Sequence, residues 1–211
     1  MKYQGIIFDL DGVICFTDKF HYEAWKTMAD EIGVYFDETI NNRLRGVSRM
    51  ASLDIILERA DRAYTQAQKE EMAERKNNYY KKLLEKMSPA DLSDEVRTTL
   101  ETLRGMGCML AIGSSSKNAK FILKQLGLES FFDAISDGTN ITRSKPDPQV
   151  FQMAAQFLNL RPEDCLVVED AIAGIDAAKD GGFAAAGLGE AADYGRTDYA
   201  LKSFGNLCRI L

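Results

Sequence analysis

The chain has 211 residues, 45% of them hydrophobic and 27% charged, which is typical of one globular domain with an insertion and excludes a wholly disordered or fibrous protein. Its 32 acidic and 26 basic residues leave a net charge of −6, which argues against a nucleic-acid-binding protein. No segment approaches the roughly 18 consecutive apolar residues of a membrane span, and the N-terminus lacks the pattern of a signal peptide.

Short apolar runs alternate with helical patterns along most of the chain. The first run, residues 5–8, is too short for a helix and rich in isoleucine, which predicts a buried strand. Comparable runs occupy residues 109–112, 134–135, 166–168 and 183–186. Between them, helical periodicity occupies residues 93–106, 118–126, 149–158 and 172–179. This alternation predicts an α/β fold with a Rossmann-like parallel sheet.

Residues 16–90 interrupt this alternation with helical patterns alone. Apolar residues recur at helical spacing from Phe20 through Trp25 to Ile32, and three more helices are predicted at residues 38–45, 50–60 and 66–87. We therefore expect an all-helical cap domain at residues 16–90, inserted into an α/β core of residues 1–15 and 91–211. Ser88 and Pro89 mark the predicted return hinge, because proline and the residue before it resist helix.

The number and spacing of the cysteines and histidines limit the kinds of disulfide and metal site that the chain can form. The four cysteines, at positions 15, 108, 165 and 208, form no C-x-x-C pair and are too sparse for a disulfide scaffold, which predicts a cytoplasmic protein with reduced thiols. His21 is the single histidine, so a multi-histidine zinc site is excluded. We expect a monomer, because no apolar stretch is left unexplained, with a small molecule as partner and neither nucleic acid nor membrane.

Polar residues follow the predicted strands of the core. They are Asp9 and Asp11, Ser114 to Asn118, Lys145, and Glu169 with Asp170. In an open parallel sheet, ligands bind beyond the carboxyl ends of the strands, where these residues would meet. Four carboxylates held together repel one another unless a cation joins them, and oxygen ligands suit Mg²⁺, which usually bridges to a phosphate. Lys145 and the Ser114 hydroxyl would offset charge on a transferring phosphoryl group.

Four segments resemble the ordered motifs of the haloacid dehalogenase superfamily. They are FDLDGV with Asp9 and Asp11, IGSSSKN with Ser114, SKPDP with Lys145, and VVEDAIAGIDAAKDGG with Glu169 and Asp170. The predicted cap is similar to that of the superfamily's sugar-phosphate mutases. This similarity lies at Thr17, His21 and Trp25, in RGVSR at 45–49, in ERKNNYY at 74–80 and in SPAD at 88–91.

The resemblance implies a separate role for each of the polar residues at the sheet edge. Asp9 would be the nucleophile that forms an aspartyl phosphate, and Asp11 the general acid and base. Mg²⁺ would be held by the Asp9 carboxylate, the Asp11 backbone carbonyl and Asp170, with Glu169 next to the metal. Ser114 and Lys145 would bind the transferring phosphate.

The resemblance also implies a second phosphate site for the end that does not react. Its residues would be Arg49 from the cap with Ser116, Lys117 and Asn118 from the core, and Ser115 of the same loop would also contact the substrate. The cap loop of Gly46, Val47 and Ser48 would face a hexose, with Lys76 beside it, and Thr17 and His21 would couple cap closure to Asp11. A mutase that converts β-D-glucose 1-phosphate into glucose 6-phosphate needs two such sites, because its intermediate, β-glucose 1,6-bisphosphate, must turn round. Cap closure would exclude water from the aspartyl phosphate.

Alternatives stay open at this point. A phosphatase on the same scaffold would let water reach the aspartyl phosphate, and a non-catalytic sensor of sugar phosphates would keep the fold without turnover. His21 could be a packed structural histidine, and Lys76 a charge on a solvated helix. Three positions depart from the expected pattern, namely Phe16, Arg45 and Ser115.

Overall fold

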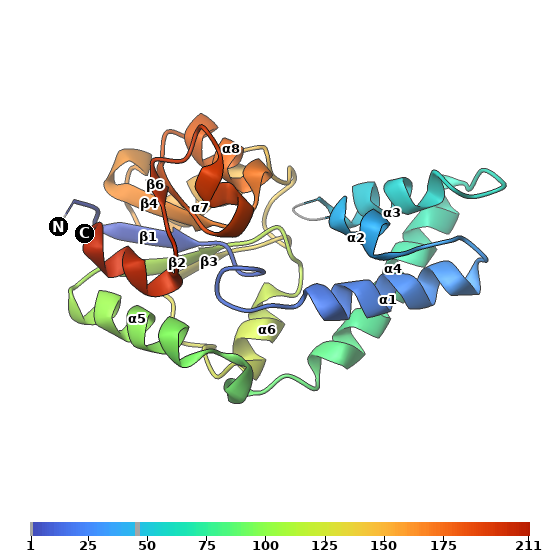
Figure 1. Ribbon diagram of the computed structural model, residues 1–211, viewed down its shortest axis with the longest axis horizontal. Helices are drawn as coiled ribbons and strands as arrows, with labels where there is room; N and C mark the ends of the chain where they lie inside the picture. The colour runs from blue at the N-terminus through green and yellow to red at the C-terminus, as the bar shows by residue number, and fades with distance from the viewer. Residues whose placement is uncertain (1, 45–46) are drawn as a thin grey trace. The chain divides into compact units, whose positions relative to one another are not determined.

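The computed structural model describes residues 2–44 and 47–211, which fold into two compact units (Figure 1). The first, here the α/β unit, comprises Met1–Phe16 and Ser88–Leu211, and the second, the helical unit, comprises Thr17–Met87. The helical unit thus starts one residue later and ends three residues earlier than the expected 16–90. Reciprocal capping within residues 88–91 explains why the helical unit ends before residue 90. The Ser88 Oγ accepts from the Ala90 N–H, and the Asp91 carboxylate accepts from the Ser88 N–H.

The α/β unit is built on a sheet in which every pairing is parallel, as the alternation predicted. Its strands are β1 (Gly5–Phe8), β2 (Met109–Gly113), β3 (Ala134–Ser136), β4 (Cys165–Glu169), β5 (Ala184–Gly187) and β6 (Tyr199–Ala200). They pair in the order β3-β2-β1-β4-β5-β6, so the chain turns outward in opposite directions on the two sides of β1. The carboxyl end of β1 therefore lies at the switch point of the sheet, where ligands bind in such folds.

Two strand predictions are corrected at the far edge of the sheet. The strand expected at residues 183–186 begins at Ala184, because the Phe183 N–H still bonds to the Ala178 carbonyl at the end of the preceding helix. The sequence analysis missed β6 altogether. Its two residues are too short to form an apolar run, and they become a strand only through pairing with β5.

Helices cover both faces of this sheet, with α7 and α8 on one side and α5 and α6 on the other (Figure 1). The helices of the unit are α5 (Asp94–Gly105), α6 (Ala119–Gln125), α7 (Gln149–Phe157) and α8 (Ile172–Asp180), with 3-10 turns η1 (Pro89–Asp91), η2 (Pro162–Asp164), η3 (Gly189–Asp193) and η4 (Phe204–Arg209). Each of the four predicted helices is found, with ends that shift by a residue or two.

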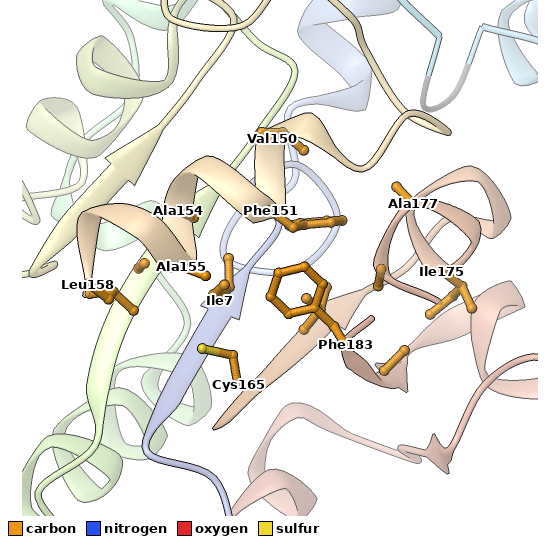
Figure 2. Close-up of a cluster of buried hydrophobic side chains, with 14 of the residues drawn as sticks. Ile7, Val150, Phe151, Ala154, Ala155, Leu158, Cys165, Ile175, Ala177 and Phe183 are labelled. Atoms are coloured by element: carbon orange, nitrogen blue, oxygen red, sulfur yellow. The ribbon is translucent and has the colours of Figure 1, made fainter. Parts of the chain in front are cut away.

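Alternate side chains of β1 pack against the helical layers on opposite faces of the sheet. Ile7 is fully buried against α7 and α8, in a cluster that includes the aromatic pair Phe151 and Phe183 (Figure 2). Phe8 points the other way and contacts Phe132 and Phe204, with ring centroids 6.2 and 5.7 Å apart. Burial on both faces explains why β1 is continuously apolar, and it makes the strand a rigid base for the residue that follows it.

The helical unit contains α1 (Asp18–Glu31), α2 (Glu38–Asn42), α3 (Arg49–Leu57) and α4 (Gln66–Leu84). Its own core includes Trp25, Met28, Leu53 and Ile56. In the part of the chain that the structure describes, no strand falls in this unit, and no helix of either unit is long and apolar enough to cross a membrane.

Three helices of this unit are shorter than predicted, and the first of them, expected at 38–45, ends at Asn42. The helix expected at 50–60 starts at Arg49, because the Ser48 Oγ caps it by accepting from the Ala51 N–H, and after Leu57 the chain forms tighter turns. The helix expected at 66–87 ends at Leu84 for the same reason. Arg45 and Gly46, which include the predicted hexose-facing glycine and one of the unusual positions, lie outside the described residues.

Candidate active site

Asp9 is fixed at the end of β1 by the sheet itself. Its N–H donates to the Val168 carbonyl at 2.9 Å, which continues the pairing of β1 with β4. The chain then turns at Gly12, which has a φ of +94° and donates its N–H to the Cys15 carbonyl at 2.7 Å. A Cβ at Gly12 would lie 2.1 Å from Oδ2 of Asp170, so only glycine allows this loop to lie against that carboxylate. Asp11 is partly buried within the same loop.

Lys145 joins the ends of β1 and β4. Its Nζ donates to Oδ1 of Asp9 and to Oε1 of Glu169, and it lies 4.7 Å from the centre of the Phe151 ring. All three charged side chains are buried, with Asp9 and Lys145 8% exposed and Glu169 1%. Burial alone would lower the pKa of Lys145, but the two carboxylates raise it above its ordinary value, so the ammonium stays charged.

The carboxylates around Lys145 are electrostatically strained. Burial raises the pKa of Asp9 well above its ordinary value, Glu169 and Asp170 raise it further, and Lys145 opposes the shift. Asp9, Glu169 and Asp170 each offer a carboxylate oxygen within 4.8 Å of the others. One ammonium cannot neutralise three carboxylates, and hard oxygen donors in this arrangement suit a divalent cation such as Mg²⁺. The residues present therefore fit the magnesium site that the sequence predicts.

Glu169 is held in place by hydrogen bonds at both of its carboxylate oxygens. Its Oε2 accepts from the N–H groups of Asp170 and Ala171, each at 2.9 Å. A Cβ at Gly174 of α8 would lie 1.9 Å from its Oε1, so the missing side chain makes room for this carboxylate. Asp170 follows directly and lies against the Gly12 loop. Glu169 thus orients Lys145, while Asp170 is the more accessible of the two.

The loop after β2 is folded by its own serine hydroxyls. Ser114 is buried and continues the sheet through its N–H, which donates to the Ser136 carbonyl at 3.0 Å. Its Oγ accepts from the Ser116 N–H at 3.1 Å, and the Ser116 Oγ accepts from the Asn118 N–H at 3.2 Å. These serines shape the loop through their oxygens, so the hydroxyl protons of Ser114 and Ser116 can point to a ligand.

The remaining residues of this loop differ in exposure. Lys117 is exposed and Asn118 is buried at the start of α6. Ser115 is partly buried, and its Oγ is enclosed with no hydrogen-bond partner among the described residues. Because β2 is the direct neighbour of β1, residues 114–118 start beside Asp9 at the same edge of the sheet.

The sequence analysis missed the loop after β3. Asp137 is fully buried, and its Oδ1 accepts from the Thr139 N–H at 2.9 Å. Its neighbour Gly138 donates its N–H to the Ser116 carbonyl at 3.1 Å, which braces the serine loop from behind. The signal that could have found Asp137 is its place directly after a strand, the same place that Asp9 has after β1.

In the helical unit, two predicted residues form a part-buried pair. Lys76 is 3% exposed and places its Nζ 2.9 Å from Nδ1 of His21. Its ammonium also lies 4.7 and 4.6 Å from the ring centres of Trp25 and Tyr80. An ammonium can only donate, so Nδ1 of His21 accepts and the ring proton sits on Nε2. Burial, together with Lys76 and Arg49, lowers the pKa of His21 well below its ordinary value.

The other predicted cap residues lie in the same unit. Thr17 is fully buried, and its Oγ1 accepts from the Tyr80 hydroxyl at 3.1 Å. Val47 and Ser48 are partly buried before α3, and Ser48 serves as its N-cap. Arg49 opens that helix and donates from Nη2 to Oδ1 of Asn77 at 2.9 Å, a buried partner that the sequence analysis did not single out.

Comparison with known proteins agrees with this fold. The haloacid dehalogenase-like hydrolase model matches residues 3–182. The chain is 42% identical over 189 residues to a β-phosphoglucomutase of Bacillus subtilis, covering 89% of this chain and 84% of that one. It is 33% identical over 185 residues to a fructose-1-phosphate phosphatase of Escherichia coli, covering 86% and 94%.

A solved structure of similar shape leads to the same family. The β-phosphoglucomutase of Clostridium difficile superposes with a TM-score of 0.90 at 36% identity, covering 97% of this chain and 93% of that one. The predicted fold, a parallel α/β sheet with a helical cap, is confirmed by this match and by the sheet described above. The chain therefore belongs to the haloacid dehalogenase-like hydrolase family.

Proposed function

We propose that the protein is a Mg²⁺-dependent β-phosphoglucomutase that interconverts β-D-glucose 1-phosphate and glucose 6-phosphate through β-glucose 1,6-bisphosphate. The observation that carries the proposal is the presence of cationic groups in both units. Lys145 lies beside Asp9 in the α/β unit, whereas Arg49 and Lys76 belong to the helical unit. A bisphosphate has two anionic ends, and a mutase must bind each of them in turn.

The reacting end would be handled by the α/β unit. In the half-reaction on β-glucose 1,6-bisphosphate, a carboxylate oxygen of Asp9 attacks the phosphorus at C1, the bond from that phosphorus to the C1 oxygen breaks, and Asp11 gives this oxygen a proton, which releases glucose 6-phosphate. Lys145 holds Asp9 in place and offsets charge on the phosphoryl oxygens, with Ser114 as a further donor. In the other half-reaction Asp11 takes the proton from the 6-hydroxyl of β-glucose 1-phosphate, whose oxygen attacks the aspartyl phosphate, so the bisphosphate forms and the Asp9 carboxylate is released.

Mg²⁺ would be held by Asp9, Asp170 and the Asp11 carbonyl, with Glu169 close by. When bound, it would reduce the repulsion among the carboxylates and stabilise the charge of the transferring phosphoryl group.

The non-reacting phosphate would be bound by Arg49 together with Ser116, Lys117 and Asn118, with Ser115 of the same loop also in the substrate site. The loop of Gly46, Val47 and Ser48 would face the hexose, with Lys76 beside it, and Thr17 and His21 would link closure to Asp11. The 42% identity to a β-phosphoglucomutase, against 33% to a phosphatase, supports this choice.

A sugar-phosphate phosphatase is the second candidate, favoured by the close relationship to the fructose-1-phosphate phosphatase of Escherichia coli. The two activities share every step up to the aspartyl phosphate. They differ in whether a sugar hydroxyl or water attacks it, and cap closure decides this by excluding water.

The deciding experiment is ³¹P NMR of the purified protein with β-glucose 1-phosphate, Mg²⁺ and a trace of glucose 1,6-bisphosphate. We expect the signal to move to glucose 6-phosphate with little inorganic phosphate. Growth of inorganic phosphate in place of glucose 6-phosphate would contradict the mutase and support the phosphatase. The Asp9→Asn variant is the control, because it should fold and show neither product.

A second experiment tests the use of two phosphate sites. Arg49→Ala should reduce mutase turnover far more than the release of phosphate from acetyl phosphate, which has a single phosphate and no second end to bind. Equal losses in the two assays would contradict the assignment of Arg49 to the non-reacting phosphate.

A further inference from the structure

Asn77 lies on the buried face of α4, where an amide is an unusual choice. Its neighbours along this face, Ala73, Lys76 and Tyr80, are buried as well, and Asn77 is 5% exposed. A buried amide without hydrogen bonds is costly, so its position requires partners. Its Oδ1 has one in the Arg49 guanidinium, whose Nη2 donates at 2.9 Å across 28 positions of sequence.

The contact orients a cation that is available to a ligand. The Arg49 side chain is 25% exposed, and guanidinium offers five N–H donors, of which Asn77 takes one from Nη2. Free arginine side chains explore many rotamers, and fixing one before binding removes that entropic cost from the affinity. The hydrogen bond therefore favours bidentate binding of an anion by the planar guanidinium, a geometry for which arginine is suited.

The neutrality of the amide matters as much as its shape. A carboxylate at this position would bind the guanidinium more strongly but would also compensate its charge. The carboxylate of Glu74 places its Oε2 3.9 Å from Nη1 of Arg49, and its side chain is 61% exposed. Glu74 therefore screens Arg49 weakly, while Asn77 holds it without neutralising it.

We propose that Asn77 is a positioning residue that presets Arg49 for a phosphate monoester, the non-reacting end of the substrate. This inference rests on the proposed function for the identity of the anion, and on the geometry of α3 and α4 for the role of Asn77. Asn77 acts through Arg49 and does not itself touch the substrate.

The first test is spectroscopic and does not depend on turnover. In ¹⁵N-labelled protein, the Nε–H signal of Arg49 is identified by its loss in Arg49→Lys and is followed during titration with inorganic phosphate. We expect a saturable shift in the wild-type protein, and about tenfold weaker binding in Asn77→Asp, because its new charge competes with the phosphate. Asn78→Asp is the matched control, since Asn78 is the adjacent, exposed asparagine and receives the same charge.

Kinetics supply the second test. Asn77→Asp should raise KM for β-glucose 1-phosphate by about tenfold while turnover of acetyl phosphate stays within about twofold. Asn77→Ala should also raise KM, through loss of orientation, and should broaden the Arg49 signal. Glu74→Gln removes the exposed carboxylate that competes weakly with phosphate for Arg49, so it should tighten phosphate binding by about twofold.

The outcomes separate this inference from the proposed function. The positioning role is wrong if Asn77→Asp and Asn78→Asp bind phosphate equally well at Arg49. It is also wrong if the Arg49 signal of the wild-type protein does not shift when phosphate is added. If Asn77→Asp does not fold, Asn77→Ala decides: an unchanged KM and an Arg49 signal as sharp as in the wild-type protein would overturn the positioning role. If the titrations behave as expected but the wild-type protein releases inorganic phosphate only, the positioning role stands and the mutase assignment fails.

Discussion

Replacing Lys145 by methionine would test the electrostatic design of the site. Lys145 is buried and is paired with both Asp9 and Glu169. Methionine has a similar length and no charge, so Lys145→Met removes the ammonium but fills most of its volume. Two buried carboxylates then lose their shared cation. Removing one partner of a buried ion pair typically costs about 3–5 kcal/mol of the free energy of unfolding, and we expect a loss in this range near pH 8.

The loss should depend on pH in a defined direction. Without the ammonium, the pKa of Asp9 in the folded state rises further, so the folded protein binds a proton more tightly than the unfolded chain. Relative to the wild-type protein, the variant should therefore become less stable as pH rises above about 4, by up to about 1.4 kcal/mol per pH unit. Its stability deficit should shrink on acidification.

Urea unfolding at pH 5 and pH 8, in EDTA and then in excess Mg²⁺, measures these effects. Lys120→Met is the matched control, because Lys120 is exposed on α6 and should tolerate the change within about 0.5 kcal/mol. Mg²⁺ should restore part of the stability of Lys145→Met, since a cation can again compensate the carboxylates. A deficit below about 1 kcal/mol at pH 8, or one that does not change with pH, would refute the reasoning.

Three further predictions concern other parts of the molecule. The pKa of His21 is lowered, so its neutral state contributes stability that is fully present above about pH 6.5 and is lost at up to about 1.4 kcal/mol per pH unit as pH falls toward the folded pKa. His21→Gln should therefore lose less stability than the wild-type protein between pH 8 and pH 5.5 in urea unfolding, and equal losses would contradict this. Asp11→Asn should lower kcat by about a hundredfold or more with the fold intact by circular dichroism, and an unchanged rate would require another proton donor. Phe151→Ala should cost about 3–5 kcal/mol in urea unfolding, because Phe151 is fully buried against Phe183; a loss under about 1 kcal/mol would mean that the core repacks.

Much of the fold could be read from local patterns. Residues 5–8 are apolar at every position because both faces of β1 are buried, and this signal is strong in a single short segment. The helices of both units follow from their periodicity, although their ends shift where a side chain such as Ser48 caps a turn. Local sequence has no comparable signal for β6, which depends on a neighbouring strand.

The candidate site likewise contains some residues that local sequence patterns indicate and others that they do not. Asp9, Glu169 and Asp170 could be named in advance, since motif order and the rule for open sheets both point to residues that follow strands. Arg49 and Lys76 were named through resemblance alone, because a charge on a helix has no local sign of its role.

What the sequence by itself determined is the kind of chemistry: the carboxylates, the lysine and the serines that can transfer a phosphoryl group. Only the tertiary structure decided how they are held, because pairing of β1 with β4 brings Asp9 and Glu169 to one ammonium across 136 and 24 positions of chain. The role of Asn77 arises in the same way, from the packing of α3 on α4. Contacts between distant segments depend on which surfaces are buried together, and no local pattern records that choice.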